Sequence, residues 1–209
     1  LSHLHSDHIS DLAEIQFQTW LGGRKAPLSV LGPKGTESTV QGFAQAFKLD
    51  SIYRSEHHGA ILPIEAYGYD VVEFDGDTNL IFQNEDTKIT AFKVDHYPVD
   101  PSYGFKIEYK DRSIVISGDT IALEEMVEYS EGVDVLFHEA LAKPLIQRME
   151  KISDEIGNDV ISKVLFDIQD YHATTIEVAE IAKRSEVGLL VFYHLIPAPR
   201  NYVSEQMFL

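Results

Sequence analysis

The chain has 209 residues, 44% of them hydrophobic, and no cysteine; it is long enough for one domain with a substantial core and excludes disulfides and thiolate metal ligands. No stretch approaches the ~20 apolar residues of a membrane span and no signal-peptide pattern is present, which favours a cytoplasmic protein. The formal net charge of −17 counts against nucleic acid as a partner, because affinity for a phosphate backbone normally depends on Lys and Arg.

Apolar periodicity and turn residues predict an alternation of helices and strands. We expect helices over residues 7–21, 36–47, 123–129, 174–185 and 202–209, and two more within 141–169. We expect strands over residues 28–31, 69–74, 79–83, 89–94, 105–109, 113–116, 133–137 and 189–194. Thr174 and Glu177 have the spacing of a capping box. The glycine loop at 32–35 has the composition of an anion-binding loop, but a plain turn is favoured.

Residues 3–8 read His-Leu-His-Ser-Asp-His, which places three imidazoles and a carboxylate within six positions. On an extended segment His3 and His5 point the same way, because side chains repeat every two residues. Asp7 and His8 then lie at the turn into the next element and point to a neighbouring place. Neutral imidazole is the commonest metal ligand in proteins, so this segment predicts contacts to two metal ions.

Three further candidate ligands follow predicted strands. His96 comes after strand 89–94, Asp119 after strand 113–116, and His194 at the end of strand 189–194. Strand ends converge at one edge of an α/β sheet, so these side chains are expected to meet there. Each of them is weak evidence alone, since Asp119 reads equally well as a turn residue and His194 as a core histidine.

In its ordered motifs the chain resembles the metallo-β-lactamase superfamily, in the ribonuclease Z and arylsulfatase-like branch. The matching segments span nearly the whole chain and are 3–8, 32–35 (Gly-Pro-Lys-Gly), 95–96 (Asp-His), 103–105 (Tyr-Gly-Phe), 117–120 (Ser-Gly-Asp-Thr), 138–140 (His-Glu-Ala), 172–175 (His-Ala-Thr-Thr) and 193–194 (Tyr-His). The resemblance implies a single αββα metallo-β-lactamase sandwich over 1–209. Several dozen residues that usually precede the first motif are missing, so an N-terminally truncated first sheet is expected, covered by a second copy in a homodimer.

The resemblance also implies ligand roles for two divalent metal ions, most often zinc, with manganese, iron or nickel as alternatives. One metal would be held by His3, His5 and His96, the second by Asp7, His8 and His194, and Asp119 would bridge them. A hydroxide shared by the metals would attack the substrate ester.

The expected catalytic residues are Asp7, His172 and Glu139. His172 occupies the position that protonates the leaving group in the ribonuclease Z pattern, although its segment departs from that pattern at Ala173. Glu139 is expected to accept a hydrogen bond from His172 and so orient it. His138 is interpreted as structural, and His57 and His58 as loop residues.

The segment 103–119 reads as a hairpin with a tight turn and leaves no room for the inserted arm with which ribonuclease Z grips tRNA. Together with the acidic charge, this favours hydrolysis of a small-molecule ester: a phosphodiester, a sulfate ester or a lactone. A tRNA 3′-processing endonuclease of the ribonuclease Z type is the alternative. A fragment that binds metal without catalysis is the third hypothesis.

Overall fold

The computed structural model describes residues 1–208, apart from the side chain of Ala60, so Leu209 of the predicted last helix lies outside the described residues. The chain divides into two compact units, Leu1–Gly76 and Asp77–Leu209, which are described separately below. The single domain expected over residues 1–209 stays a prediction. Within residues 1–208, no helix is long and apolar enough to cross a bilayer.

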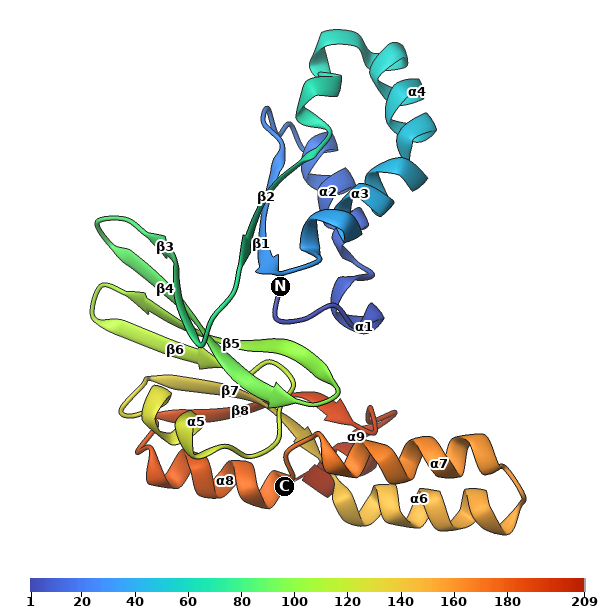
Figure 1. Ribbon diagram of the computed structural model, residues 1–209, viewed down its shortest axis with the longest axis vertical. Coiled ribbons are helices and arrows are strands. Elements are labelled where there is room, and N and C mark those ends of the chain that lie inside the picture. The colour runs from blue at the N-terminus through green and yellow to red at the C-terminus, as the bar shows by residue number, and fades with distance from the viewer. Residues whose placement is uncertain (209) are drawn as a thin grey trace. The chain divides into compact units, whose positions relative to one another are not determined.

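The first unit is built on a two-stranded parallel sheet, in which β1 pairs with β2. Its elements in order are α1 (Ser6–Ile9), α2 (Leu12–Leu21), β1 (Leu28–Pro33), α3 (Thr36–Ala46), α4 (Lys48–His58), two 3₁₀ turns (Gly59–Ile61 and Ile64–Ala66) and β2 (Tyr69–Phe74). Leu12, Val30 and Val40 form its core, and Trp20 is fully buried in a second cluster with Leu62. The crossover from β1 to β2 contains α3, α4 and the two 3₁₀ turns (Figure 1).

The structure corrects two expectations in this unit. The helix predicted over 7–21 is two helices that are separated at residues 10–11. His57 and His58, predicted as loop residues, end helix α4, and their rings lie 4.8 Å apart. Helix α4 carries Leu49, Ile52 and Tyr53 at helical spacing, but Leu49 and Tyr53 are exposed and Ser51 is its one buried residue.

The glycine loop at 32–35 is a turn whose amides are already bonded. Gly35 has φ +102°, a left-handed conformation that glycine adopts without strain. The backbone N–H groups of Gly35 and Glu37 both donate to Oε1 of Glu73, at 2.9 Å each. The anion at this helix N-terminus is thus a carboxylate of the protein itself, which agrees with the favoured interpretation of a plain turn.

The second unit is built on a six-stranded sheet with the order β3-β4-β5-β6-β7-β8. Its strands are β3 (Thr78–Gln83), β4 (Thr87–His96), β5 (Val99–Tyr109), β6 (Arg112–Ile116), β7 (Val135–Leu141) and β8 (Leu189–Ile196). Its helices are α5 (Glu124–Tyr129), α6 (Lys143–Glu155), α7 (Asp159–Asp167), α8 (Thr175–Arg184) and α9 (Tyr202–Glu205), with 3₁₀ turns at Ile168–Asp170 and Gln206–Phe208. The pairs from β3 to β6 are antiparallel, whereas β6, β7 and β8 run parallel.

Helices α5 and α8 cover one face of this sheet (Figure 1). The core between them contains Phe92, Val94, Val115, Met126, Val133, Leu136, Ile181 and Ala182, each less than 9% exposed. Burial of these side chains is the main favourable contribution to folding of the unit. Because the parallel strands β6, β7 and β8 all end at the same edge, the residues that follow them are brought together.

Gly104, in the Tyr-Gly-Phe motif, permits a close approach of β5 to its neighbours. A Cβ at this position would lie 2.6 Å from ring atoms of Phe92 and 2.9 Å from the backbone oxygen of Ser117. Neither neighbour can move freely, because Phe92 belongs to the core and Ser117 follows β6. The motif is therefore a packing requirement beside the Ser-Gly-Asp-Thr segment.

The predicted capping box at helix α8 is present. Thr174 Oγ1 accepts from the backbone N–H of Glu177 at 3.3 Å, and Glu177 Oε2 accepts from the backbone N–H of Thr174 at 2.9 Å. We expect Thr174→Ala to lower the free energy of unfolding by about 1 kcal/mol, because the backbone N–H of Glu177 loses its acceptor at the start of the helix. Thermal unfolding checks this, with Thr175→Ala as the control; equal midpoints for the two variants would contradict it.

Candidate metal centre

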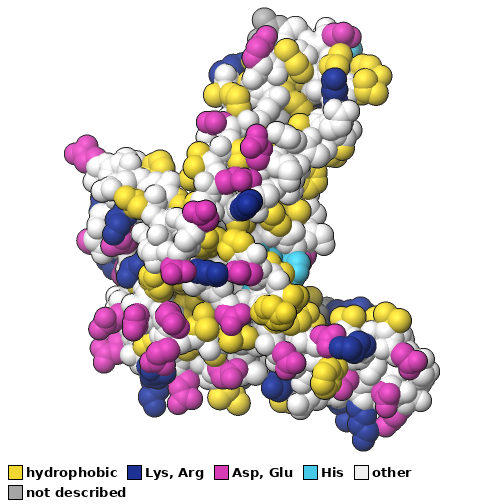
Figure 2. All heavy atoms as spheres, viewed as in Figure 1, with side chains coloured by type: hydrophobic (Ala, Val, Ile, Leu, Met, Phe, Trp, Pro, Cys, Tyr) yellow, Lys and Arg dark blue, Asp and Glu magenta, His cyan; other side chains and the backbone are white. Residues whose placement is uncertain are grey.

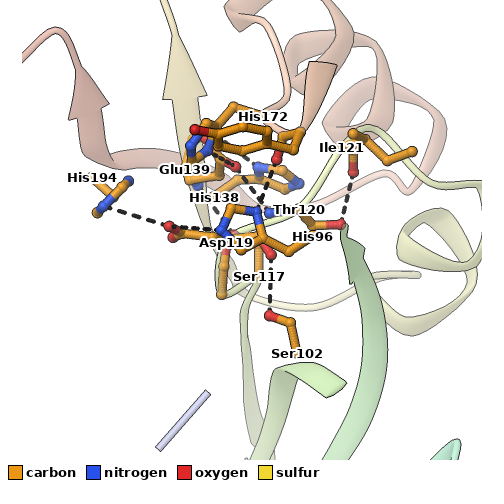
Figure 3. Close-up of polar contacts among 12 residues, drawn as sticks. His96, Ser102, Ser117, Asp119, Thr120, Ile121, His138, Glu139, His172 and His194 are labelled. Atoms are coloured by element: carbon orange, nitrogen blue, oxygen red, sulfur yellow. Dashed lines mark hydrogen bonds and ion pairs between the residues drawn. The ribbon is translucent and has the colours of Figure 1, made fainter. Parts of the chain in front are cut away.

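Two histidines converge on one carboxylate in the second unit. His96 ends β4, Asp119 lies in the loop after β6, and His194 lies in β8. The Nε2 atoms of His96 and His194 lie 3.9 Å and 3.6 Å from Oδ2 of Asp119, as Figure 3 shows. Asp119 is 1% exposed, so its charge is largely out of water. The structure thus brings together three predicted ligands that lie nearly 100 positions apart in sequence.

The orientation of His96 is fixed by a backbone carbonyl. Its Nδ1 lies 3.0 Å from the carbonyl oxygen of Tyr171, so Nδ1 carries the proton and donates it there. Nε2, which faces Asp119, then keeps a free lone pair. A metal-ligating histidine typically has this arrangement, in which the second nitrogen donates to a carbonyl or carboxylate.

His194 is positioned by a bulge in the parallel pair of β7 and β8. Tyr193 pairs with Glu139 and Leu195 pairs with Ala140, so His194 is the extra residue between them. Its φ is +44°, a left-handed conformation that costs a non-glycine residue about 1–3 kcal/mol. The bulge breaks the alternation along β8 and turns the imidazole toward Asp119.

Glu139 and His172 form a buried pair beside these three residues. His172 Nδ1 lies 2.8 Å from Oε1 of Glu139, the contact that we expected from sequence. The same oxygen accepts the backbone N–H of Thr120 at 2.9 Å. Burial raises the pKa of Glu139 well above its ordinary value, and the hydrogen bond from Thr120 acts in the opposite direction.

His172 also lies within reach of the candidate ligands. Ligand atoms of His96, Asp119 and His172 lie within 4.8 Å of one another, and so do those of Glu139, His172 and His194. The geometry of the second unit is therefore compatible with His172 either as a metal ligand or as a proton donor beside the metals. The two roles differ in whether metal is lost when His172 is replaced.

The other four predicted ligands cluster in the first unit. His3 lies before α1, His5 is its N-cap in an extended conformation, and Asp7 and His8 lie in its first turn. The ring of His3 lies 4.8 Å from that of His5 and 4.2 Å from that of His8. His8 Nε2 lies 3.7 Å from Oδ2 of Asp7. As predicted, an extended segment leads into a helix. The four side chains that could bind a metal all lie within residues 3–8.

The donor sets of both clusters fit divalent transition metals. Imidazole nitrogen and carboxylate oxygen, without thiolate, suit zinc and are compatible with manganese, iron or nickel. Two donors about 2.1 Å from one tetrahedral zinc lie about 3.4 Å apart, close to the separations of His96 and His194 from Asp119. The residues present therefore fit the metals that the sequence predicts.

His138 is fully buried, and its side-chain hydrogen bond goes to a backbone carbonyl and not to a predicted metal ligand. Its Nδ1 donates to the carbonyl oxygen of Glu139 at 2.8 Å. Burial lowers the pKa of His138 to about 4, and this hydrogen bond opposes the shift only in part. A neutral, buried imidazole agrees with the structural interpretation of this residue.

The low pKa of His138 makes folding stability depend on pH. An unfolded histidine titrates near pH 6.5, so between pH 6.5 and 4 the unfolded chain binds a proton that the folded chain does not. The free energy of unfolding therefore falls as pH falls through this window. Urea unfolding of wild type and His138→Leu, with chelator present, is expected to show that the wild type loses about 2 kcal/mol more between pH 7 and 5. Parallel curves would contradict this.

Sequence reasoning did not identify three supporting groups. The carbonyl of Tyr171 leaves no signal in sequence because any residue supplies one. In sequence Ser117 and Tyr193 are visible only as motif members, although Ser117 is buried, Tyr193 is half-buried and each is close to a predicted ligand along the chain. Their positions directly before Gly118 and His194 are the signal that was available.

The chain matches a family model described as "Beta-lactamase superfamily domain" over residues 1–195. Ribonuclease Z of Mycobacterium marinum (strain ATCC BAA-535 / M) is 34% identical over 204 residues, which cover 95% of this chain and 67% of the relative. The chain thus spans about two thirds of the length of that relative. Human tRNase Z, short form, matches with a TM-score of 0.63 at 22% identity, over 93% of this chain and 70% of that structure. A metallo-beta-lactamase fold protein from Bacillus subtilis matches with a TM-score of 0.62 at 20% identity, over 99% of this chain and 67% of that structure.

These similarities correct the expectation that nucleic acid is an unlikely partner, which is wrong because relatives across the chain are ribonucleases by name. The physical error was to read binding from the net charge of −17, which sums the whole surface. Acidic side chains gather over the part of the second unit that holds α5 and α8 (Figure 2). An acidic region there has little effect on the binding of a phosphate at the metal centre if the two are well separated, because salt screens exposed charges beyond about 10 Å.

Proposed function

The chain belongs to the β-lactamase superfamily, a family of metal-dependent hydrolases, and on that basis we propose that it is a binuclear phosphodiesterase that cleaves RNA of the tRNA-precursor type. The observation that carries the proposal is the convergence of His96 and His194 on Asp119, with the Glu139–His172 pair beside them. The resemblance in sequence to ribonuclease Z supports RNA as the substrate over the small-molecule ester that we expected at first.

In this proposal the chain would hold two metal ions. His3, His5 and His96 would be ligands of one, Asp7, His8 and His194 would be ligands of the other, and Asp119 would be shared by both. Zinc is the proposed metal, on the chemistry of the donors. When bound, the metals lower the pKa of a water molecule toward neutrality and offset charge on the scissile phosphate.

The residues of the chain orient the substrate and move a proton. As water attacks phosphorus, the bond from phosphorus to the ribose oxygen breaks, and that oxygen needs a proton. His172 supplies it from Nε2, because Nδ1 is bonded to Glu139. Glu139 accepts the hydrogen bond from Nδ1 and so keeps the ring oriented. Asp7 is proposed to act in the same centre, as a ligand that also accepts a hydrogen bond from the attacking water.

Cleavage of a precursor tRNA by the metal-loaded protein tests the proposal. We expect cleavage at one position near the 3′ side of the acceptor stem, loss of cleavage with chelator, and recovery when zinc is restored. Bis(p-nitrophenyl) phosphate, an aryl sulfate and a lactone serve as comparison substrates. If the protein holds two metals but cleaves neither the precursor tRNA nor bis(p-nitrophenyl) phosphate, the proposal fails and a non-catalytic metal-binding role replaces it.

A further inference from the structure

A groove in the first unit lies between helix α2 and the start of helix α4. Its volume of about 620 Å³ is in the range of pockets that hold small organic ligands. Two aromatic rings and three charged side chains line it, and no step of the proposed reaction uses them. We call it the α2–α4 groove, and the lining residues that bear on its chemistry are Ser10, Glu14, Phe17, Phe47, Asp50 and Arg54.

Arg54 is held in one orientation by contacts on two sides. Its Cζ lies over the ring of Phe17, 4.4 Å from the ring centre, and its Nε donates to both carboxylate oxygens of Asp50 at 2.9 Å and 3.1 Å. Among the described residues, the side-chain hydrogen bonds of Arg54 both use Nε. The N–H groups on its two Nη atoms are therefore left for acceptors on a ligand, in a plane that Phe17 fixes.

Phe47 offers a second flat surface in the groove. It lies at the junction of α3 and α4, and it is 46% exposed. Unpaired RNA bases stack on aromatic rings and on the planes of arginine guanidinium groups, and this stacking tolerates any base. A groove that combines an exposed phenylalanine ring with an oriented guanidinium is thus suited to a planar heterocycle.

The α2–α4 groove starts next to the candidate metal ligands of the same unit. Ser10 lines it and lies two residues after His8, so their Cα atoms are at most about 7 Å apart. Glu14 and Phe17 line it about one and two helical turns further along the chain. An RNA strand with a phosphate at the metal cluster therefore has this groove within reach of a neighbouring nucleotide.

The charges of the α2–α4 groove favour a base over another phosphate. Glu14 and Asp50 are carboxylates, and Arg54 is the one cation among the described residues of the lining. A phosphate would meet more negative than positive charge here, whereas the amino groups of bases donate hydrogen bonds to carboxylates. Bases inside a duplex are already stacked and paired, so the groove fits an unpaired base.

We propose that the α2–α4 groove binds one unpaired base of the RNA substrate, stacked on Phe47 beside the guanidinium of Arg54. The inference rests on the proposed function and adds to it a contact that selects single-stranded RNA near the cleaved bond. Loss of one stacking contact weakens single-strand binding by about 5–150-fold. Because neither residue touches the scissile phosphate, their loss raises KM for RNA and leaves kcat nearly unchanged.

The experiment measures binding of a labelled oligoadenylate to the zinc-loaded chain by fluorescence anisotropy. Phosphorothioate linkages protect this probe from hydrolysis, adenine supplies an amino group, and a labelled RNA duplex of the same length is the comparison probe. Phe47→Leu removes the ring and keeps an apolar side chain, whereas Phe47→Tyr keeps the ring. Arg54→Lys keeps the charge and removes the plane. Values of kcat and KM on precursor tRNA, together with thermal unfolding, are measured for each variant.

Phe166→Leu and Arg112→Lys are matched controls in the second unit. Phe166 is 55% exposed in α7, and Arg112 pairs with the carboxylate of Asp134 as Arg54 does with that of Asp50. We expect Phe47→Leu and Arg54→Lys to weaken oligoadenylate binding about tenfold and to raise KM by a similar factor. Phe47→Tyr and both controls should bind as the wild type does, and duplex binding should be the same in all variants.

Failure of the groove and failure of the proposed function give different results. If Phe47→Leu and Arg54→Lys bind oligoadenylate as tightly as their controls, or lose single-strand and duplex binding equally, the base site is wrong; cleavage of precursor tRNA by the wild type then leaves the proposed function standing. A wild type that neither cleaves precursor tRNA nor binds oligoadenylate overturns both. If Phe47→Leu does not fold, Arg54→Lys decides alone.

Discussion

Asp119→Asn is expected to remove most metal binding and to reduce phosphodiester hydrolysis about a thousandfold. Asparagine keeps the size of the side chain and loses its charge, so the change isolates the anionic ligand. A metal centre contributes several kcal/mol of transition-state stabilisation, and each 1.36 kcal/mol is a factor of ten in rate. The two imidazoles would then face a neutral amide in place of the carboxylate, 3.6 Å and 3.9 Å away.

Elemental analysis of dialysed protein and initial rates on precursor tRNA measure this effect. Asp111→Asn is the control, because Asp111 lies exposed in the turn between β5 and β6. Thermal unfolding with chelator present shows whether the variant is folded. A variant that keeps two metals per chain and full activity would exclude Asp119 as the bridging ligand, and with it the proposed arrangement of the centre.

The strands and most helices are visible in the sequence because their apolar residues recur at the period of a strand or of a helix. Strand β2, for example, is predicted with the bounds 69–74 that the structure has. Helix α4 was not predicted because its few apolar residues lie in a polar segment and are mostly exposed. Arg54 Nε, which donates to both carboxylate oxygens of Asp50 one turn earlier, supports the helix in place of core packing. Three apolar residues at helical spacing within a polar segment are a weak signal of a helix.

The residues of the candidate site were predictable from sequence, whereas the orientations of their side chains were not. Strand ends place His96, Asp119 and His194 at one edge, which a topological argument anticipates. The bulge that turns His194 toward Asp119 depends on the register of β7 against β8, which arises only when the sheet forms. The same holds for the carbonyl of Tyr171, since a backbone group 75 residues from His96 carries no sequence signal.

His172→Ala is expected to lower kcat on precursor tRNA by about 10²–10⁴-fold while both metals remain bound. The reason is chemical, because a ribose oxygen is a poor leaving group and needs a proton as its bond to phosphorus breaks. Nitrophenolate leaves without one. The rate on bis(p-nitrophenyl) phosphate should therefore fall far less than the rate on RNA.

The two substrates separate the possible roles of His172. Loss of one metal together with equal losses on both substrates would make His172 a ligand, which its 4.8 Å grouping with His96 and Asp119 permits. Glu139→Gln sharpens the comparison, since glutamine keeps the size of the side chain but can turn either its amide oxygen or its amide nitrogen toward Nδ1 of His172, and so orients the ring less well. Its rate on RNA should fall in the same direction as that of His172→Ala, by a smaller factor, with metal content unchanged. A selective loss on RNA in both variants would place the proton donor on His172 and its orienting partner on Glu139, because only departure of the ribose oxygen depends on that pair.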